Sequence, residues 1–207
     1  EQLQQLQIDA SASSQYVSAL LLISPALPFE LQIEVDSVLP SIRHVEMTVA
    51  EVNACGAQIE NLGGETGDWN TRQIRHLWRC RPARLRGGER HIEPDLTNAG
   101  PFLAAAMICG GQVSIPHWPA KTFQAGDAWR QLLTPMGARI YRSPEGSLVC
   151  QGSGVIGGTQ CDLEAVGELT PTLAALCTLA VEPSKLTGIG HLRGHETDRL
   201  NALETEI

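Results

Sequence analysis

Long apolar stretches alternate along this chain with short segments in which apolar and polar residues take turns. Three stretches have the length and spacing of helices that pack on a sheet: "YVSALLLISPA" (16–26), "AGPFLAAAMICGG" (99–111) and "TLAALCTLAV" (172–181). Each precedes a segment typical of a strand, at 31–35, 112–118 and 185–190. The pattern therefore predicts three helix–strand pairs.

A second helix and two further strands follow the first two pairs. The helices are predicted at 41–56 and 126–137, and the strands at 57–61, 71–78, 138–143 and 147–152. Both helices end in a Gly-Ala step, "ACGAQI" and "PMGARI", and glycine is the residue that most readily forms a left-handed C-cap. The third pair is followed by a helix from Glu196, without the two closing strands. We expect a repeated unit in a chain that is the fragment of a longer protein, with sequence missing at both ends.

The repeat indicates an α/β protein whose helices bury one face against sheets. A stretch rich in glycine and arginine near 80–90 separates the first copy from the other two. We therefore expect two domains, residues 1–88 and residues 89–207.

The charge distribution leaves two interpretations of one segment. The net charge of -8 argues against general affinity for nucleic acids, yet seven of the 15 basic residues lie within 71–90. The segment is either a patch that binds nucleic acid or phosphate or a half-exposed strand with a connector. His76 and Trp78 alternate with Arg75 and Arg79, as on a strand with one exposed face, and a glycine pair then marks a connector. We favour the strand.

Other composition signals exclude several classes of protein. No stretch has the roughly 18 consecutive apolar residues of a membrane helix, and "EQLQQLQIDA" lacks the regions of a signal peptide. Six scattered cysteines without CxxC spacing indicate reduced thiols. His191 and His195 have HxxxH spacing, but Gly194 argues against the continuous helix that a zinc site of this kind needs. We expect a cytoplasmic protein that binds no metal, membrane or nucleic acid.

Serines gather where the first helix begins. Ser13 and Ser14 precede the helix, and Gln15 falls in its first turn. Free backbone N–H groups and the positive end of the helix dipole make such a site suited to phosphate. Plain helix capping is the alternative use of serine at this position.

Carboxylates stand at three other helix starts. In "GELTP", Thr170 is the predicted N-cap, which leaves Glu168 just outside the helix. Asp95 in "EPDLTN" is more typical of a cap and is a weaker candidate for binding. Glu196 and Arg199 fall on the apolar stripe of the last predicted helix. They either form a local i, i+3 ion pair or face a polar cleft.

Five segments occur in the order expected of 5-enolpyruvylshikimate-3-phosphate synthases. They read "ASSQYVSALLL", "LPSIRHVEMT", "IEPDLTNAGPFLAAA", "VGELTPTLAAL" and "GIGHLRGHETDRL", and the chain resembles about the middle half of such an enzyme, in its actinobacterial branch. The resemblance implies two similar lobes of three βαβαββ-type units each, the inverse α/β barrel of enolpyruvyl transferases. It also implies transfer of the enolpyruvyl group of phosphoenolpyruvate to the 5-hydroxyl of shikimate 3-phosphate. This step leads to chorismate and the aromatic amino acids and uses no metal or organic cofactor.

The resemblance assigns roles in the first repeat. Ser13, Ser14 and Ser41 would bind the phosphate of shikimate 3-phosphate, and Gln15 would touch both substrates. His44 stands where a tyrosine is also found, and it is a weaker candidate.

Roles in the later repeats follow in the same way. Glu168, where many relatives have aspartate, would take the proton of the 5-hydroxyl, and Glu196 would protonate the methylene carbon of phosphoenolpyruvate. Arg199 would clamp phosphoenolpyruvate through charge-assisted contacts. His195 replaces a lysine that binds shikimate 3-phosphate, and His191, a weaker candidate, replaces an asparagine.

Two alternatives stay open. One is the sister enzyme that acts on UDP-N-acetylglucosamine, which is expected to lack "HETDR" and "SSQ". The other is a non-catalytic, phosphate-binding remnant of the fold. The family's terminal Lys-Ser, Arg, Asn-Ala-Gly-Thr and His-Arg segments are absent from this chain, so we expect it to show no useful turnover alone. The complete enzyme is expected to be a monomer.

Overall fold

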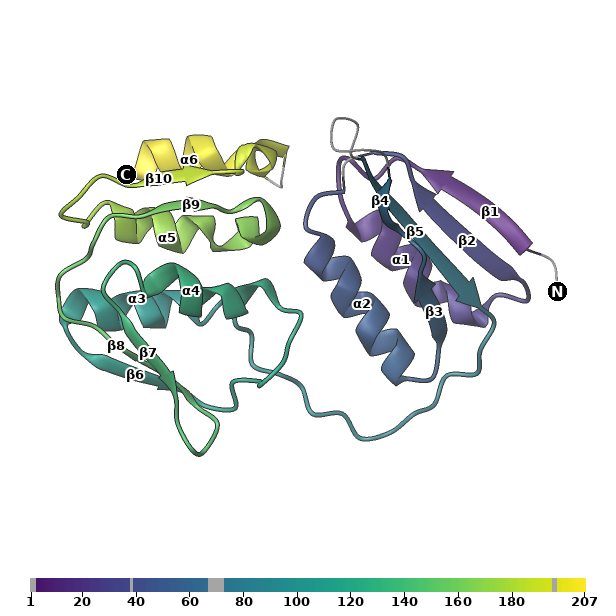
Figure 1. Cartoon of the computed structure of the whole chain (residues 1–207), viewed down its shortest axis with the longest axis horizontal. Helices are drawn as coiled ribbons and strands as arrows, with labels where there is room; N and C mark the ends of the chain where they lie inside the picture. Colours follow the sequence, from purple (N-terminus) through teal and green to yellow (C-terminus); the bar gives the residue numbers. More distant parts are fainter. Residues whose placement is uncertain (1–2, 38, 67–72, 195–196) are drawn as a thin grey trace. The chain divides into compact units, whose positions relative to one another are not determined.

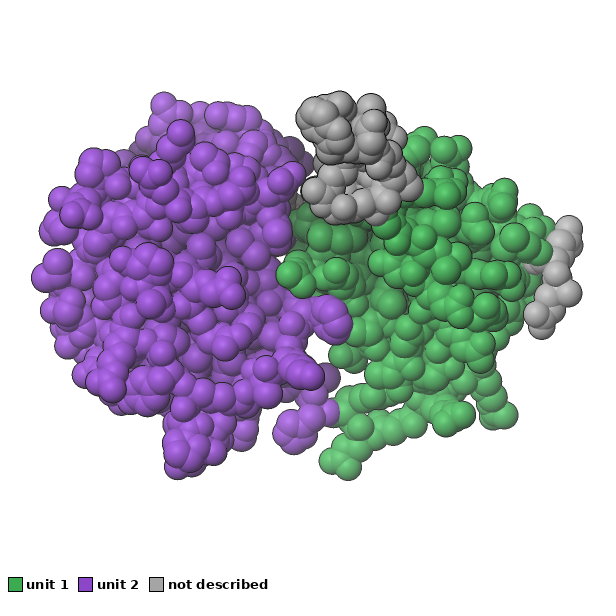
Figure 2. Space-filling view, in the orientation of Figure 1, with its two compact units in different colours: residues 1–90 green, residues 91–207 purple. Residues whose placement is uncertain are grey.

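The computed structural model describes residues 3–37, 39–66, 73–194 and 197–207. The chain forms two compact units, residues 1–90 and residues 91–207 (Figures 1 and 2). Each unit has a hydrophobic core of its own. The observed boundary lies two residues beyond the one expected from composition.

Unit 1 has the element order βαβαββ with one short extra strand. In chain order, its elements are β1 (Leu3–Ile8), α1 (Gln15–Ile23), a 3₁₀ turn (Ser24–Ala26), β2 (Glu30–Val35), α2 (Ile42–Ala54), β3 (Gln58–Asn61), β4 (Gly64–Thr66) and β5 (Gln73–Arg81). The sheet order is β1-β2-β5-β3, and β4 also pairs with β5. β1 and β2 are parallel, whereas β5 is antiparallel to both β2 and β3. Both helices therefore return along the same face of the sheet, side by side (Figure 1).

The two faces of this sheet differ in the way that strand alternation requires. Ile33 opposes Trp78 and Ile59 opposes Cys80, and all four are buried in the core beneath the helices. The residues between them point to the other face. This alternation creates one face that packs and one that carries charge.

The charged face explains the arginines of β5. Arg75 Nε donates to Glu34 Oε1 at 2.9 Å, and Arg81 Nη1 donates to Glu60 Oε1 at 2.7 Å. Arg79 forms an ion pair with Glu30. The Arg81 guanidinium also holds the pKa of Glu60 below its ordinary value. The strand-and-connector interpretation of the segment is therefore confirmed over the described residues.

Unit 2 contains two partial copies of this order, αβαββ followed by βαβα. Its first part contains α3 (Gly100–Cys109), β6 (Gln112–Ile115), a 3₁₀ turn (Ala125–Ala128), α4 (Trp129–Leu133), β7 (Arg139–Arg142) and β8 (Leu148–Gln151). Its second part contains β9 (Gln160–Asp162), a 3₁₀ turn (Glu164–Leu169), α5 (Thr170–Cys177), β10 (Lys185–Thr187), a 3₁₀ turn (Gly190–Gly194) and α6 (Arg199–Glu206). The sheet order β6-β8-β7 reproduces β2-β5-β3, and β9 and β10 are parallel like β1 and β2.

The predicted glycine caps are confirmed in both units. Gly56 and Gly137 have φ values of 98° and 103°. Ala57 N donates to Val52 O at 3.2 Å, and Ala138 N donates to Leu133 O at 3.1 Å, so both helices end in the same 6→1 hydrogen bond. This shared ending supports the repeat inferred from sequence.

Several local predictions were wrong, among them the omission of β4. β9 was not predicted, because three residues are too few to establish an alternating pattern and they pair with the distant β10. α6 begins at Arg199 rather than at Glu196, since Asp198 caps it. Thr170 is the first residue of α5 and Leu169 is its N-cap, because the preceding 3₁₀ turn runs directly into the helix.

No helix within the described residues is long and apolar enough to cross a membrane.

Candidate active site

The loops that begin α1 and α2 leave the same edge of the unit 1 sheet. β1 and β2 are parallel, so their carboxyl ends meet at that edge. The backbone N–H of Ala10 donates to Ser37 Oγ at 3.0 Å, which joins the two loops directly. The amino ends of both helices are thus brought together.

Ser13, Ser14 and Gln15 form the start of α1. Ser14 is the N-cap and is buried, and its carbonyl oxygen accepts from Val17 N and Ser18 N, each at 3.1 Å. Ser13 Oγ accepts from Gln15 N at 3.2 Å, so the capping hydroxyl comes from Ser13. Gln15 is exposed at the first position of the helix.

A carboxylate that sequence reasoning missed orders the same loop. Asp9 Oδ1 accepts from Ser11 N at 2.8 Å. Hydrogen bonds from the Ser11 side chain and backbone hold the pKa of Asp9 below its ordinary value. The carboxylate is therefore ionised at neutral pH and helps to shape the loop before any ligand binds.

Ser41 begins α2 in an unusual backbone conformation. It has φ 49° and ψ 45°, the left-handed region that costs a residue with a Cβ about 1–2 kcal/mol. Its carbonyl oxygen accepts from His44 N at 3.0 Å, which closes the first turn. Ser41 and His44 therefore lie at the same sheet edge as the α1 serines, and strain of this kind is often found at functional sites.

Glu168 lies in a short turn of unit 2 that leads into α5. Val166 has non-helical φ and ψ of −139° and 37°, so the residues after it form a separate turn. Glu168 is half-buried, while the next two residues, Leu169 and Thr170, are fully buried. The backbone on the carboxyl side of Glu168 is therefore fixed by the core.

His191 lies against the same turn. A Cβ on Gly167 would come within 2.9 Å of His191 Cε1 and closer still to Nε2. The imidazole thus packs against Gly167, the residue that precedes Glu168. Leu192, the next residue, is fully buried and anchors this segment.

Arg199 begins α6 behind a well-formed cap. Asp198 Oδ1 accepts from Leu200 N at 3.1 Å and from Asn201 N at 3.0 Å, and Arg193 Nη1 donates to Asp198 Oδ2 at 3.0 Å. The Asn201 backbone N–H makes the largest contribution to lowering the pKa of Asp198. Asp198 was not singled out by sequence reasoning, although Asp two residues before an apolar position is a recognisable cap signal.

The remaining candidates differ in what the structure says of them. His195 and Glu196 lie outside the described residues. Asp95 accepts from Asn98 N at 2.9 Å and from Asn98 Nδ2 at 2.8 Å, which closes the turn before α3. The N-cap of α3 is Ala99, so the expected capping of the helix by Asp95 was wrong.

Among the described candidates, the serines, Gln15 and His44 lie at the helix starts of unit 1, and Glu168 and His191 lie where the 164–169 and 190–194 turns of unit 2 meet. Arg199 begins α6, and Asp95 lies before α3.

The comparisons with known proteins address the family directly. A sequence model described as EPSP synthase (3-phosphoshikimate 1-carboxyvinyltransferase) matches residues 1–207. This chain belongs to the EPSP synthase family. The resemblance to 5-enolpyruvylshikimate-3-phosphate synthases is therefore confirmed.

Two curated relatives carry the same description. The 3-phosphoshikimate 1-carboxyvinyltransferase of Kocuria rhizophila is 46% identical over 202 residues, covering 97% of this chain and 43% of the relative. That of Bifidobacterium longum is 42% identical over 209 residues, covering 98% of this chain and 45% of the relative. The chain thus spans less than half the length of these relatives.

A solved structure shows the fold. The crystal structure of the enolpyruvyl transferase NikO from Streptomyces tendae aligns with a TM-score of 0.57 at 16% identity, over 84% of this chain and 40% of that chain. At this level of identity, the likeness concerns the fold alone. The predicted enolpyruvyl transferase-like α/β class is confirmed.

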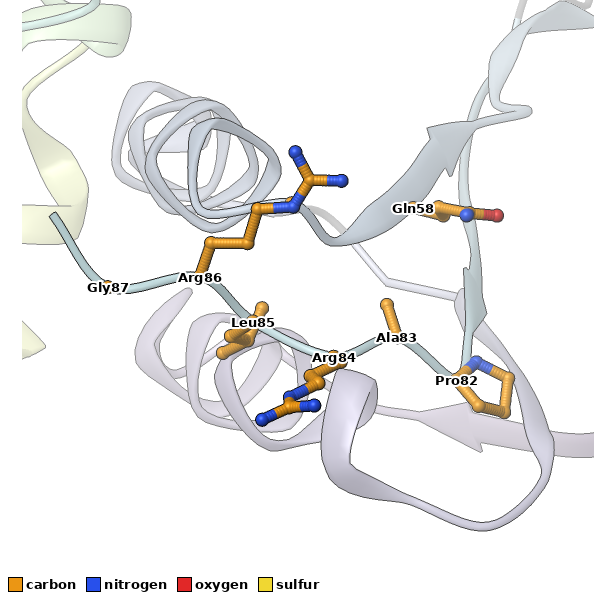
Figure 3. A pocket seen from close by; sticks show the side chains of 8 residues that line it. Gln58, Pro82, Ala83, Arg84, Leu85, Arg86 and Gly87 are labelled. Carbon is orange, nitrogen blue, oxygen red and sulfur yellow. The ribbon is translucent and has the colours of Figure 1, made fainter.

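An open hollow of about 680 Å³ in unit 1 lies apart from these groups (Figure 3). It is lined by Gly56, Gln58 and residues 82–87, at the carboxyl end of α2 and so at the opposite end of that helix from Ser41. Arg84 and Arg86 point to different sides of the connector (Figure 3). The hollow therefore belongs to the connector and not to the helix starts.

Proposed function

We propose that the complete protein transfers the enolpyruvyl group of phosphoenolpyruvate to the 5-hydroxyl of shikimate 3-phosphate. The observation that carries this proposal is the convergence of the α1 and α2 starts, with Ser13, Ser14, Gln15 and Ser41, at one edge of unit 1. The family membership of the whole chain supports it.

Unit 1 supplies the binding site for shikimate 3-phosphate in this proposal. The first backbone N–H groups of a helix have no partner within the helix, and its dipole favours an anion there. Two such helix starts stand together, each with serine hydroxyls beside it. This arrangement is suited to binding a phosphate monoester.

Unit 2 supplies the acid, the base and a clamp. Glu168 takes the proton of the 5-hydroxyl, whose oxygen bonds to the substituted carbon of phosphoenolpyruvate, while Glu196 gives a proton to the methylene carbon. Loss of the methyl proton and of inorganic phosphate then restores the double bond. Arg199 pairs with the anionic groups of phosphoenolpyruvate. Two carboxylates can share this work only if their proton affinities differ.

Several expectations belong to the same proposal. Residues 1–88 and residues 89–207 are parts of the N-terminal and C-terminal lobes. The complete enzyme is a cytoplasmic monomer that uses no cofactor and binds no nucleic acid or membrane. Residues 1–207 alone show no useful turnover, because each missing charge-assisted contact to a substrate costs roughly 1.5–3 kcal/mol and each 1.36 kcal/mol is tenfold in rate.

Calorimetric titration of the complete protein separates this function from its alternatives. We expect binding of shikimate 3-phosphate, and stronger binding of phosphoenolpyruvate once shikimate 3-phosphate is present. Preference for UDP-N-acetylglucosamine would indicate the sister enzyme. Binding of shikimate 3-phosphate without product formation would indicate a non-catalytic remnant.

The serines can be tested in the same titration. Ser13→Ala with Ser14→Ala should weaken shikimate 3-phosphate binding at least tenfold, because charge-assisted hydrogen bonds are worth roughly 1.5–3 kcal/mol each. Ser153→Ala is the control, since Ser153 Oγ bonds within its own loop, to the backbone of Val155. Equal affinity of the two variants would overturn the assignment of the α1 start.

A further inference from the structure

The contact between Gly167 and His191 gives Gly167 a role that its backbone does not demand. Gly167 is not among the glycines with positive φ, so another residue could adopt its conformation. The only demand for glycine comes from space, since a Cβ there would collide with two atoms of the His191 ring. The His191 ring thus packs directly against Gly167, in the space that a side chain at position 167 would occupy.

This pair adds a contact to the Glu168 turn on the amino side of Glu168, where Gly167 is itself buried. Leu169 and Thr170 are fully buried on the carboxyl side of Glu168, whereas the non-helical Val166 interrupts the turn on the amino side. Gly167 is the one residue between that break and Glu168. Contact with the His191 ring therefore limits how Glu168 can tilt.

His191 is itself held in place by its neighbour. Leu192 is fully buried, its backbone N–H donates to Ile189 O at 3.1 Å, and its Cδ2 would lie 3.4 Å from a Cβ on Gly167. The side chains of His191 and Leu192 therefore both pack against the 164–169 turn. The 190–194 and 164–169 turns act as one packed element.

We propose that His191 is a positioning residue, whose imidazole packs on Gly167 and sets the orientation of Glu168. This proposal rests on the proposed function, in which Glu168 is the base. It differs from a direct role of His191 in holding shikimate 3-phosphate. A positioning residue affects the rate of the chemical step, whereas a ligand-binding residue affects the affinity.

The test uses the complete enzyme and a matched pair of glycine variants. Gly167→Ala should lower kcat by roughly 10²-fold, the effect expected of displacing a catalytic group by about 1 Å. The dissociation constant of shikimate 3-phosphate should stay within about threefold. Gly190→Ala is the control, because a Cβ at Gly190 meets no atom within 4 Å, and it should keep its kcat within about twofold.

A double variant distinguishes positioning from general disruption. Removing the ring with His191→Ala relieves the collision, so the double variant with Gly167→Ala should be at least tenfold more active than Gly167→Ala alone. Two independent defects would instead multiply, because distant or unrelated effects add in free energy. His191→Ala alone should lower kcat and leave the affinity for shikimate 3-phosphate unchanged.

Each outcome decides the proposal. Activity of Gly167→Ala equal to that of Gly190→Ala overturns it, and so does a double variant no better than Gly167→Ala. If Gly167→Ala does not fold, His191→Ala decides: loss of affinity with unchanged kcat overturns positioning. Glu168→Gln serves as the reference. If Glu168→Gln is fully active, Glu168 is not the base, and the proposed function itself is overturned. If Glu168→Gln is inactive while Gly167→Ala is fully active, only the positioning role of His191 is overturned.

Discussion

The side-chain hydroxyls of Ser18 and Thr48 lie 3.0 Å apart and join α1 to α2. Thr48 Oγ1 also lies 2.9 Å from His44 O, one turn earlier in its own helix. Because a threonine hydroxyl has one proton, it donates to His44 O and accepts from Ser18. This bond, together with the one from Ala10 N to Ser37 Oγ, holds the two helix starts in register.

Thr48→Val should weaken the packing of α1 on α2. The change removes the hydrogen bond to Ser18 while keeping the volume, and a buried or half-buried hydrogen bond contributes about 1 kcal/mol. Native-state hydrogen exchange of the α1 and α2 amides measures the change locally. Thr205→Val is the control, since Thr205 Oγ1 donates to Asn201 O in its own helix. Equal loss of protection in both variants would show that the link to Ser18 contributes nothing.

Gly56→Ala should destabilise unit 1 by about 1–2 kcal/mol, the penalty of the left-handed region for a residue with a Cβ. The φ of Gly56 is 98°, and the nearest atom to an added Cβ is 3.6 Å away, so the penalty is conformational rather than steric. Gly88→Ala, with no atom within 4 Å and no positive φ, should be neutral. Urea unfolding of the two variants tests this, and equal midpoints would refute the C-cap.

The pH dependence of unit 1 stability should depend on His76. Its ring stacks on Trp78 at 6.0 Å, and burial lowers the pKa of His76 below its ordinary value of 6.5. The unfolded chain then binds a proton that the folded chain resists, so the contribution is fully present above pH 6.5 and decreases as the pH falls below it. The unfolding free energy should rise with pH between pH 5 and 8, and this dependence should be lost in His76→Gln. His91→Gln, in the exposed connector, should keep the slope, and its loss there as well would count against His76.

Phosphate should bind first at the start of α1. Titration of this chain with inorganic phosphate should shift the amide resonances of Ser13, Ser14 and Gln15 at lower concentrations than others, because the positive end of the helix dipole and serine hydroxyls converge there. The amides of the 125–128 turn, which precedes α4, provide an internal comparison, since Asp127 lies in that turn. If other amide resonances shift while those of residues 13–15 do not, the phosphate site at the start of α1 is contradicted.

The sequence predicted the features that depend on near neighbours. The caps at Gly56 and Gly137 follow from one residue type at a helix end, and the alternation of β5 follows from residues two apart. β9 escaped prediction because its pairing partner lies 25 residues away. The Ala10–Ser37 bond and the contact of His191 on Gly167 escaped for the same reason, since each joins loops that only the fold brings together. Asp198 displaced the expected start of α6 because its side chain bonds two helix amides.

Phosphate release by the complete protein, mixed with phosphoenolpyruvate and shikimate 3-phosphate, tests the central claim most directly. We predict steady turnover by the unaltered protein, and a loss of roughly 10²–10⁴-fold in kcat for Glu196→Gln, as expected when a general acid is removed. The affinity of that variant for shikimate 3-phosphate should be unchanged, because the acid acts on the other substrate. No phosphate release by the unaltered complete protein, or full activity of Glu196→Gln, would contradict the account.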